Sequence, residues 1–105
     1  TGRLRELALL LGRKTALERL ATFLLTLTGG SHLASVEVAV PITRGEIADH
    51  LGLTIETISR NVTLLKRSGL ICERRGGLLL PDCRRLARVA EGREELPLGP
   101  KAREA

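Results

Sequence analysis

The chain has 105 residues and a formal net charge of +5, so it is long enough for one small domain, and its charge favours a polyanionic partner. Phe23 is the one aromatic residue, which disfavours RNA- and single-strand-binding modules that stack bases on exposed aromatic side chains. The sequence has no secretory signal or long apolar run, and two cysteines cannot by themselves supply four metal ligands, so we expect a cytoplasmic protein with no cofactor in this segment.

The chain opens with leucines at helical spacing over residues 3–11, and residues 12–15 break that phase. Thr15 and Glu18 have the spacing of a capping box, in which each side chain bonds the backbone N–H of the other residue, so a new helix is expected from about Ala16. The first leucines would pack onto the core of the same domain. Because the sequence starts inside a helix and without methionine, we expect a fragment of a longer protein.

The next segment predicts a helix and a strand. An apolar stripe indicates a helix over 16–28, ended by Gly29 and Gly30. This stripe consists of Leu17, Leu20, Ala21, Leu24 and Leu27. Valines alternate with other residues over 36–40, which predicts a strand. Pro41 would end the pairing of this strand or place it at the edge of a sheet.

Residues 43–68 are predicted to form a helix-turn-helix. Thr43 begins a second capping box, and Gly52 stands where a helix ends in a left-handed residue. Thr54 can cap the second helix, which is expected from residue 55 to about 68. In such a unit the second helix enters the major groove of DNA.

The second helix has two different faces on a wheel of about 100° per residue. Ile58, Val62 and Leu65 fall together and predict the buried stripe. The opposite side is polar and ends basic, with Glu56, Ser59, Arg60, Thr63 and Arg67. An ordinary surface helix would also have a polar outer face. The preceding helix, the glycine turn and the caps favour a DNA-binding helix instead.

A β-hairpin is predicted directly after this helix. The apolar residues 70–71 and 78–80 flank a turn at 75–77 that contains two glycines. A hairpin in this position is a wing.

The C-terminal part is predicted to be one helix and a tail. The helix is expected to start at 81–82 and to end at Gly92. Cys83 in this helix and Cys72 in the hairpin are expected to be small packing residues, with a redox role as the less favoured alternative. Residues 93–105 contain two prolines and many charges, which is typical of a flexible tail.

The segment LGLTIETISRNVTLLKRSGLI, residues 51–71, resembles the helix-turn-helix of the CRP/FNR superfamily of bacterial transcription regulators. Within it, Glu56, Ser59 and Arg60 match the E-x-x-S-R recognition motif of the FNR and FixK branch. The preceding ITRGEIADHLGL and the glycine-containing hairpin match the same winged-helix domain. The resemblance covers roughly residues 11–92.

The resemblance implies a mainly α fold with a small β component: a winged helix-turn-helix with a three-helix core and a β-hairpin wing. It implies that residues 1–14 are the end of a dimerisation helix and a hinge, which is the alternative to packing of the first leucines on this domain. The break in phase at Gly12 favours the hinge. Residues 15–92 would then be the DNA-binding domain and 93–105 the tail.

Three residues are the candidates for reading bases. A guanidinium can bond to both O6 and N7 of guanine, and Arg60 lies at the centre of the outer face. Glu56 can accept from N4 of cytosine, and it can either orient Arg60 or form a plain surface ion pair with it. Ser59 is small enough to approach a base edge. The resemblance implies that these three residues read an FNR-type TTGAT half-site, while Ile55 either touches the groove or closes the core.

Phosphate contacts are expected from the rims of this surface. Thr54 and Thr57 offer hydroxyl and N–H groups at the start of the second helix, where the helix dipole favours an anion. Arg44 matches a position that touches the DNA backbone in family members. Further charge is available from the helix end and the wing, at Lys66, Arg67, Arg74 and Arg75. Such contacts fix the register of a protein on DNA and do not read sequence.

The expected function is sequence-specific binding of double-stranded DNA at an inverted-repeat operator. The resemblance implies a homodimer in the full-length protein, RNA polymerase as a further partner, and no membrane partner. It also implies an N-terminal sensor domain outside this stretch, whose ligand is unknown; cyclic nucleotide, haem and an iron–sulfur cluster are all compatible with these residues. The alternative is a winged helix that binds proteins, which predicts a neutral or apolar outer face. An enzyme is not expected, because the sequence has no nucleophile–base pair or phosphate-binding glycine loop.

Overall fold

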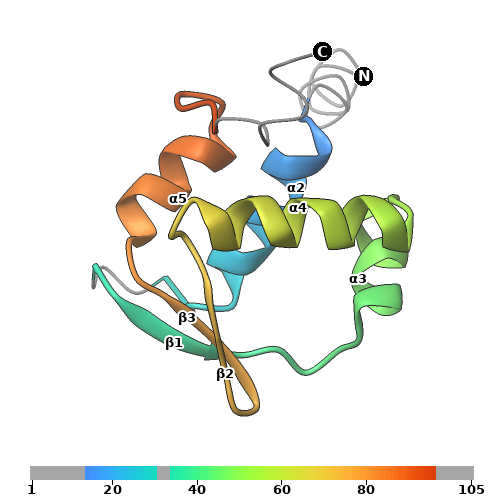
Figure 1. Ribbon diagram of the computed structural model, residues 1–105, viewed down its shortest axis with the longest axis horizontal. Coiled ribbons are helices and arrows are strands. Elements are labelled where there is room, and N and C mark those ends of the chain that lie inside the picture. Colours follow the sequence, from blue (N-terminus) through green and yellow to red (C-terminus); the bar gives the residue numbers. More distant parts are fainter. Residues whose placement is uncertain (1–13, 31–33, 97–105) are drawn as a thin grey trace, which may run out of the picture.

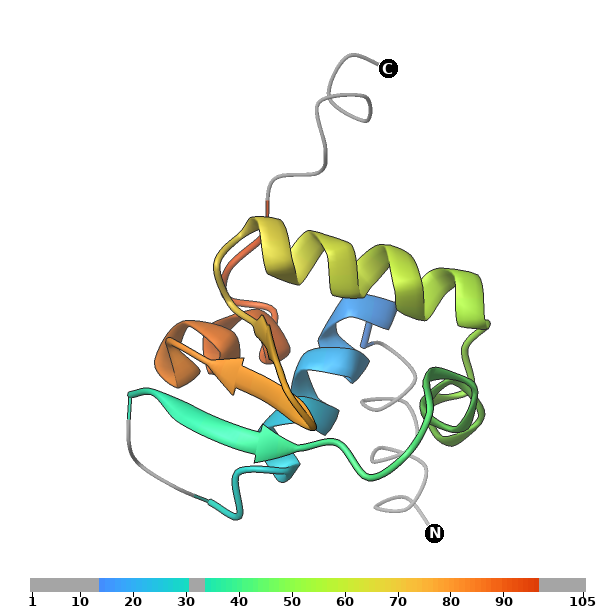
Figure 2. The ribbon, with the colours of Figure 1, turned by 60° about the horizontal axis from the view of Figure 1, so that its bottom comes forward.

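The computed structural model describes residues 14–30 and 34–96. In chain order these residues form α2 (Ala16–Thr26), β1 (Val36–Ala39), α3 (Arg44–Leu51), α4 (Ile55–Arg67), β2 (Cys72–Arg74), β3 (Gly77–Leu80) and α5 (Cys83–Ala90). Helix α4 crosses α2, with α3 on one side and the small sheet on the other (Figures 1 and 2). The predicted fold class, mainly α with a small β component, is confirmed.

Both predicted capping boxes are present. The hydroxyl of Thr15 accepts from the N–H of Glu18, whose carboxylate accepts from the N–H of Thr15. Thr43 and Glu46 make the same pair of bonds at the start of α3. Each box satisfies N–H groups that have no partner inside the helix, so the starts of α2 and α3 are encoded locally.

The sheet is larger than the predicted hairpin. Its strand order is β1-β3-β2 and all pairs are antiparallel. In the pairing of β1 with β3, Val36 lies opposite Leu80 and Ala39 opposite Gly77. Strand β1 therefore forms an edge and ends before Pro41, as a residue without a backbone N–H donor requires.

The predicted hairpin is present and Cys72 lies in its first strand, as expected, but this strand is 72–74 and does not include the apolar pair 70–71. Leu70 and Ile71 are 0% and 1% exposed. Both side chains enter the core, whereas the alternate residues of a strand point to opposite faces of the sheet. The apolar pair is thus the buried link between α4 and β2.

The core lies between the helices and one face of the sheet. Helix α2 packs against α4 and α5, and α3 packs against α4. The largest buried side chains in this core include Leu20, Ile58, Leu65, Leu80 and Leu86. Full burial of an aliphatic side chain of this size stabilises a fold by about 1.5–3 kcal/mol. The stripe predicted for the second helix is therefore the side that holds α4 on the domain.

The two ends of the described chain are tied to α5. The Lys14 ammonium donates to the carbonyl of Ala90 at 2.7 Å. Packing continues beyond the domain boundary predicted at residue 92, because Leu96 is 6% exposed and belongs to the core cluster. The predicted helix end and hinge at 1–13 and the predicted tail at 97–105 lie outside the described residues.

Candidate nucleic-acid interface

The turn between α3 and α4 fixes the angle of the helix-turn-helix. Gly52 has φ 70°, a left-handed conformation that a side chain would strain, as predicted. The N–H of Leu53 donates to Ala48 O at 2.8 Å. From α2, the Arg19 guanidinium donates to Leu51 O at 3.1 Å. Helix α3 therefore ends with its carbonyls bonded both to the turn and to α2.

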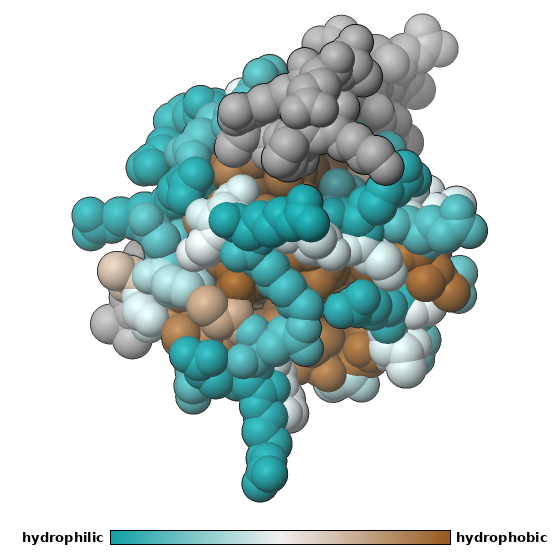
Figure 3. Space-filling model, viewed as in Figure 1, coloured by the Kyte–Doolittle hydropathy of each residue, from teal (hydrophilic) through white to brown (hydrophobic). Residues whose placement is uncertain are grey.

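The predicted faces of α4 are confirmed. Ile58 and Leu65 are buried, and Val62 is partly buried against the same core. The outer face carries Glu56, Ser59, Arg60, Thr63 and Arg67, of which Ser59 is partly exposed and the others are exposed. Figure 3 shows hydrophilic side chains over α4 and around the hairpin on this side of the molecule. This surface has the polarity that base edges and phosphates require.

Ile55 begins this face with an apolar side chain. This residue is 56% exposed, and among the described residues Ile55 is the large hydrophobic residue that is classed as exposed. The alternative that Ile55 closes the core is wrong, because a core residue would be excluded from water. A methyl-bearing side chain at this end of α4 is available for contact with a thymine methyl.

The three candidate base-reading residues differ in their surroundings. Arg44 donates to the hydroxyl of Ser59 at 3.5 Å, so α3 and α4 bring a candidate phosphate ligand to a candidate base reader. Glu56 and Arg60 are both exposed, and no ion pair joins these two described side chains. The i,i+4 contact that would orient Arg60 is therefore not among the ion pairs of the described residues.

The start of α4 is held by its two threonines. The Thr54 hydroxyl accepts from the N–H of Thr57 at 3.1 Å and donates to the Thr57 hydroxyl at 2.9 Å. Thr54 is the N-cap of the 13-residue helix. An N-terminus of this kind concentrates unpaired N–H groups and the positive end of the helix dipole. These groups can therefore hold a phosphate that approaches the start of α4.

The basic residues at the other rim are partly paired with acids. Lys66 bonds the carboxylate of Glu73 on β2, and Arg74 lies 3.8 Å from Glu37 on β1. Arg67 and Arg75 are exposed and belong to none of the ion pairs found among the described residues. The hydrogen bond from Lys66, with its charge and that of Arg44, holds the pKa of Glu73 below its ordinary value of 4.5 although slight burial opposes this. The sequence did not identify Glu73 as part of this surface. Its position there is known only from its contact with Lys66.

Comparisons with known proteins agree with this geometry. Residues 18–89 match the model of the Crp-like helix-turn-helix domain. The chain belongs to this family. It is 47% identical over 90 residues to the nitrogen fixation regulation protein FixK of Azorhizobium caulinodans, covering 80% of this chain and 33% of FixK. It is 40% identical over 94 residues to the transcriptional activator protein FnrL of Cereibacter sphaeroides, covering 82% of this chain and 38% of FnrL.

Solved structures give the same relationship. FixK2 from Bradyrhizobium japonicum matches with a TM-score of 0.66 and 41% identity, over 83% of this chain and 46% of FixK2. The chain therefore spans less than half the length of these relatives. Membership of the CRP/FNR family, inferred from residues 51–71, is confirmed, and the relatives are named as regulators and not as enzymes.

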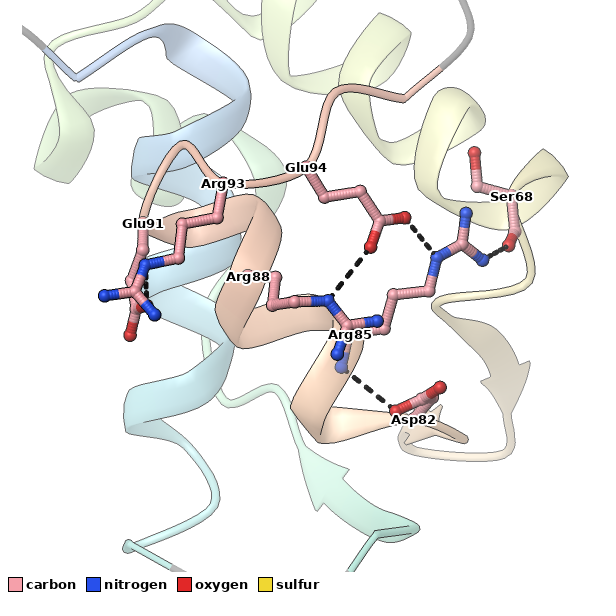
Figure 4. Close-up of polar contacts among 7 residues, drawn as sticks. All are labelled: Ser68, Asp82, Arg85, Arg88, Glu91, Arg93 and Glu94. Atoms are coloured by element: carbon pink, nitrogen blue, oxygen red, sulfur yellow. Dashed lines mark hydrogen bonds and ion pairs between the residues drawn. The ribbon is translucent and has the colours of Figure 1, made fainter.

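The Crp-like domain has a polar network behind α4 that the sequence did not predict (Figure 4). Arg85 on α5 donates to the carbonyl of Ser68, the C-cap of α4, at 2.9 Å. Arg85 also bonds the carboxylate of Glu94, which accepts from Arg88 at 3.2 Å. Asp82 caps the start of α5 by accepting from the N–H of Arg85 at 3.0 Å. Helix α5 and the segment that directly follows it therefore meet the C-terminal end of α4.

This network predicts a pH-dependent stability. The hydrogen bond from Arg85 is the main cause that lowers the pKa of Glu94 from its ordinary value of 4.5. Burial opposes it, and the bond from Arg88 and the charges of both arginines lower the pKa further. A carboxyl with a lowered folded pKa stabilises the fold above about pH 4.5 and loses that effect as the pH falls through its folded pKa. Glu94→Gln should therefore be less stable than the native chain at pH 7, and the difference should shrink below pH 4.5. Urea unfolding followed by circular dichroism between pH 7 and pH 3 measures this difference.

Glu95→Gln is the matched control for this experiment. Glu95 is exposed and takes no part in the network, yet its replacement removes the same charge one residue away. We expect this variant to follow the native pH profile. If the free energy of unfolding of Glu94→Gln is lower than that of the native protein by the same amount at every pH, the stabilising bonds of Glu94 do not depend on its charge.

Of the two cysteines, Cys83 is placed as a packing residue in the core. Cys83 is buried at the start of α5, Cys72 is partly buried on β2, and both are free thiols. Burial, with the nearby charge of Asp82 second, raises the pKa of Cys83. A raised pKa leaves less thiolate at neutral pH, which disfavours reactivity. In the part of the chain that the structure describes, no group of three or more His, Cys, Asp or Glu side chains is arranged to hold a metal ion.

The described residues also hold no helix that is both long and apolar enough to cross a membrane.

Proposed function

We propose that this Crp-like domain binds double-stranded DNA sequence-specifically, as the DNA-reading part of a CRP/FNR-type transcription regulator. The observation that carries the proposal is the outer face of α4, where Glu56, Ser59 and Arg60 stand exposed or partly exposed beside the capped start of the helix. The hairpin β2–β3 lies beside this helix in the position of a wing (Figure 1). The names of the regulators FixK and FnrL, which match this same domain, support the proposal.

The half-site that we propose is TTGAT. Arg60 would bond O6 and N7 of its guanine, and Glu56 would accept from N4 of the paired cytosine. Ser59 would approach a neighbouring base, and Ile55 would meet a thymine methyl. A second copy of the chain would read the inverted repeat, since a dimer of helix-turn-helix units binds half-sites related by twofold symmetry.

We propose that DNA phosphates on either side of the base-reading face are held by residues at its two edges. Thr54 and Thr57 would bond one phosphate at the start of α4, and Arg44 would bond another beside Ser59. At the opposite rim the proposed contacts are Lys66, Arg67 and Arg75. We propose RNA polymerase as a further partner of the complete regulator, because FnrL is named as a transcriptional activator.

A salt series on DNA tests this function. The chain is linked at its N-terminus to a dimeric coiled coil, and its affinity for a labelled duplex with a TTGAT inverted repeat is measured by fluorescence anisotropy. If four cations of each domain neutralise phosphates, the log–log slope per domain should be about −3 to −4. A duplex of the same length and composition with scrambled half-sites is the control, and it should bind more weakly at every salt concentration.

The alternative function is binding of a protein partner by the same winged helix. It predicts that affinity for both duplexes is absent or flat with salt. That result would reject DNA binding, whereas a steep slope with equal affinity for both duplexes would reject the TTGAT half-site alone.

A further inference from the structure

The wing places a carboxylate among the cations of the proposed DNA surface. Glu73 on β2 bonds Lys66 in the last turn of α4. Glu73 and Arg44 also line the same surface groove, which has a volume of about 240 Å³ and an otherwise apolar lining. Arg44 donates to Ser59. One acid therefore lies close to two cations for which we propose phosphate contacts.

The pairing of Lys66 with Glu73 is accessible to exchange. The two side chains are 34% and 63% exposed. Ion pairs at this exposure are weak, because water and salt screen both charges. A DNA phosphate can therefore replace Glu73 as the partner of Lys66. The carboxylate then remains near the phosphates and is repelled by them.

We infer that Glu73 restrains the sequence-independent affinity of this domain for DNA, by neutralising Lys66 and the surroundings of Arg44 in the free protein. The inference rests on the proposed function, and it names Glu73 as a residue that lowers the affinity for DNA. Non-specific DNA outnumbers target sites by orders of magnitude in a cell. A domain with a small electrostatic affinity therefore spends less time on the wrong sequences.

The test is Glu73→Gln in the 105-residue chain, with a random-sequence duplex as the probe. Removal of the acid should tighten binding at 50 mM salt about two- to fivefold, the effect of one charge pair separated by about 4 Å in water. The log–log slope against salt should become steeper by up to about 0.9, because the phosphate at Lys66 no longer shares this ammonium with Glu73. Binding is measured by anisotropy between 50 and 200 mM salt.

Glu91→Gln is the matched control. It removes the same charge from an exposed pair with Arg93 at 3.3 Å, in the turn after α5 (Figure 4). This variant should keep the native affinity and slope. Lys66→Gln should weaken binding in both backgrounds, but less in the native chain, where the variant also loses the competing pair with Glu73, than in the Glu73→Gln background, where it should remove most of the gain. Such coupling distinguishes release of Lys66 from a general change in net charge.

The outcomes separate the inference from the proposed function. Native chain that binds DNA with a steep salt slope, together with a Glu73→Gln variant that binds equally or more weakly, overturns the inference and leaves DNA binding standing. A gain of the same size in Glu91→Gln also overturns it, because net charge would then explain the effect. Lack of salt-dependent binding by native chain and variants alike overturns both.

Discussion

Replacing Arg60 by alanine in the dimeric protein is expected to weaken binding to a TTGAT inverted repeat by about 1–3 kcal/mol per half-site. The guanidinium is exposed at the centre of the outer face of α4, so its loss would remove the two proposed bonds to guanine without disturbing the core. Binding to scrambled DNA should change much less. The measurement is the ratio of the two dissociation constants at one salt concentration, because each constant alone depends strongly on salt.

Thr54→Ala is the comparison for Arg60→Ala. Thr54 caps α4 and is proposed to contact a phosphate, so its loss should weaken binding to both duplexes about equally. It should also lower the stability of the free domain by about 1 kcal/mol, as loss of an N-cap does. If Arg60→Ala behaves like Thr54→Ala on DNA, Arg60 contacts phosphate and does not read a base.

Replacing Gly77 by alanine is expected to destabilise the domain by about 1–3 kcal/mol or more, as overpacking of a closely packed site does. A Cβ at this position would lie 2.1 Å from the carbonyl oxygen of Val38 and 3.1 Å from the Cα of Ala39. Both are backbone atoms of β1, which pairs with β3 at this point, so no side chain can rotate away. Chemical unfolding followed by circular dichroism measures the loss.

Gly45→Ala is the matched control for Gly77→Ala. Gly45 lies inside α3, and a Cβ there would meet Ile55 and Thr43 at the ordinary contact distances of 3.6 and 3.8 Å. Alanine in a helix interior is more stable than glycine by about 0.5–1 kcal/mol, so at this first-turn position the variant should gain a smaller part of that stability. If both variants gain stability, β1 and β3 do not approach as closely as the pairing at Ala39 and Gly77 requires.

Features that depend on residues close in sequence could be predicted. A threonine followed three residues later by glutamate marks the start of α2 and of α3, and Gly52 marks the turn before α4. The helical period identified Ile58 and Leu65 as the buried side of α4. Each of these signals concerns a local hydrogen bond or the geometry of one helix, so no knowledge of the tertiary structure was needed.

Features that depend on distant residues could not be predicted. Val36 pairs with Leu80, and nothing near either residue specifies the other. The bond of Arg85 to Ser68 O and the pair of Lys66 with Glu73 likewise join different elements. The pair Leu70–Ile71 resembles a strand because apolar residues suit both strands and buried links, and only the packing decides between them. The candidate base readers could be found from one helix, α4. The position of Glu73 beside Lys66 could not, because it depends on how β2 packs next to α4.

The pairing of β1 with β3 has a consequence for how the protein forms during synthesis. All of α3 and α4 lies between these two strands, so the sheet closes a chain loop that contains the whole helix-turn-helix. Helix α2 also packs on α5, the last helix described. Translation proceeds from the N-terminus, so β1 and α2 must wait for partners that leave the ribosome after the whole helix-turn-helix. The unit proposed to contact DNA is therefore enclosed by the sheet only after most of the described chain has emerged.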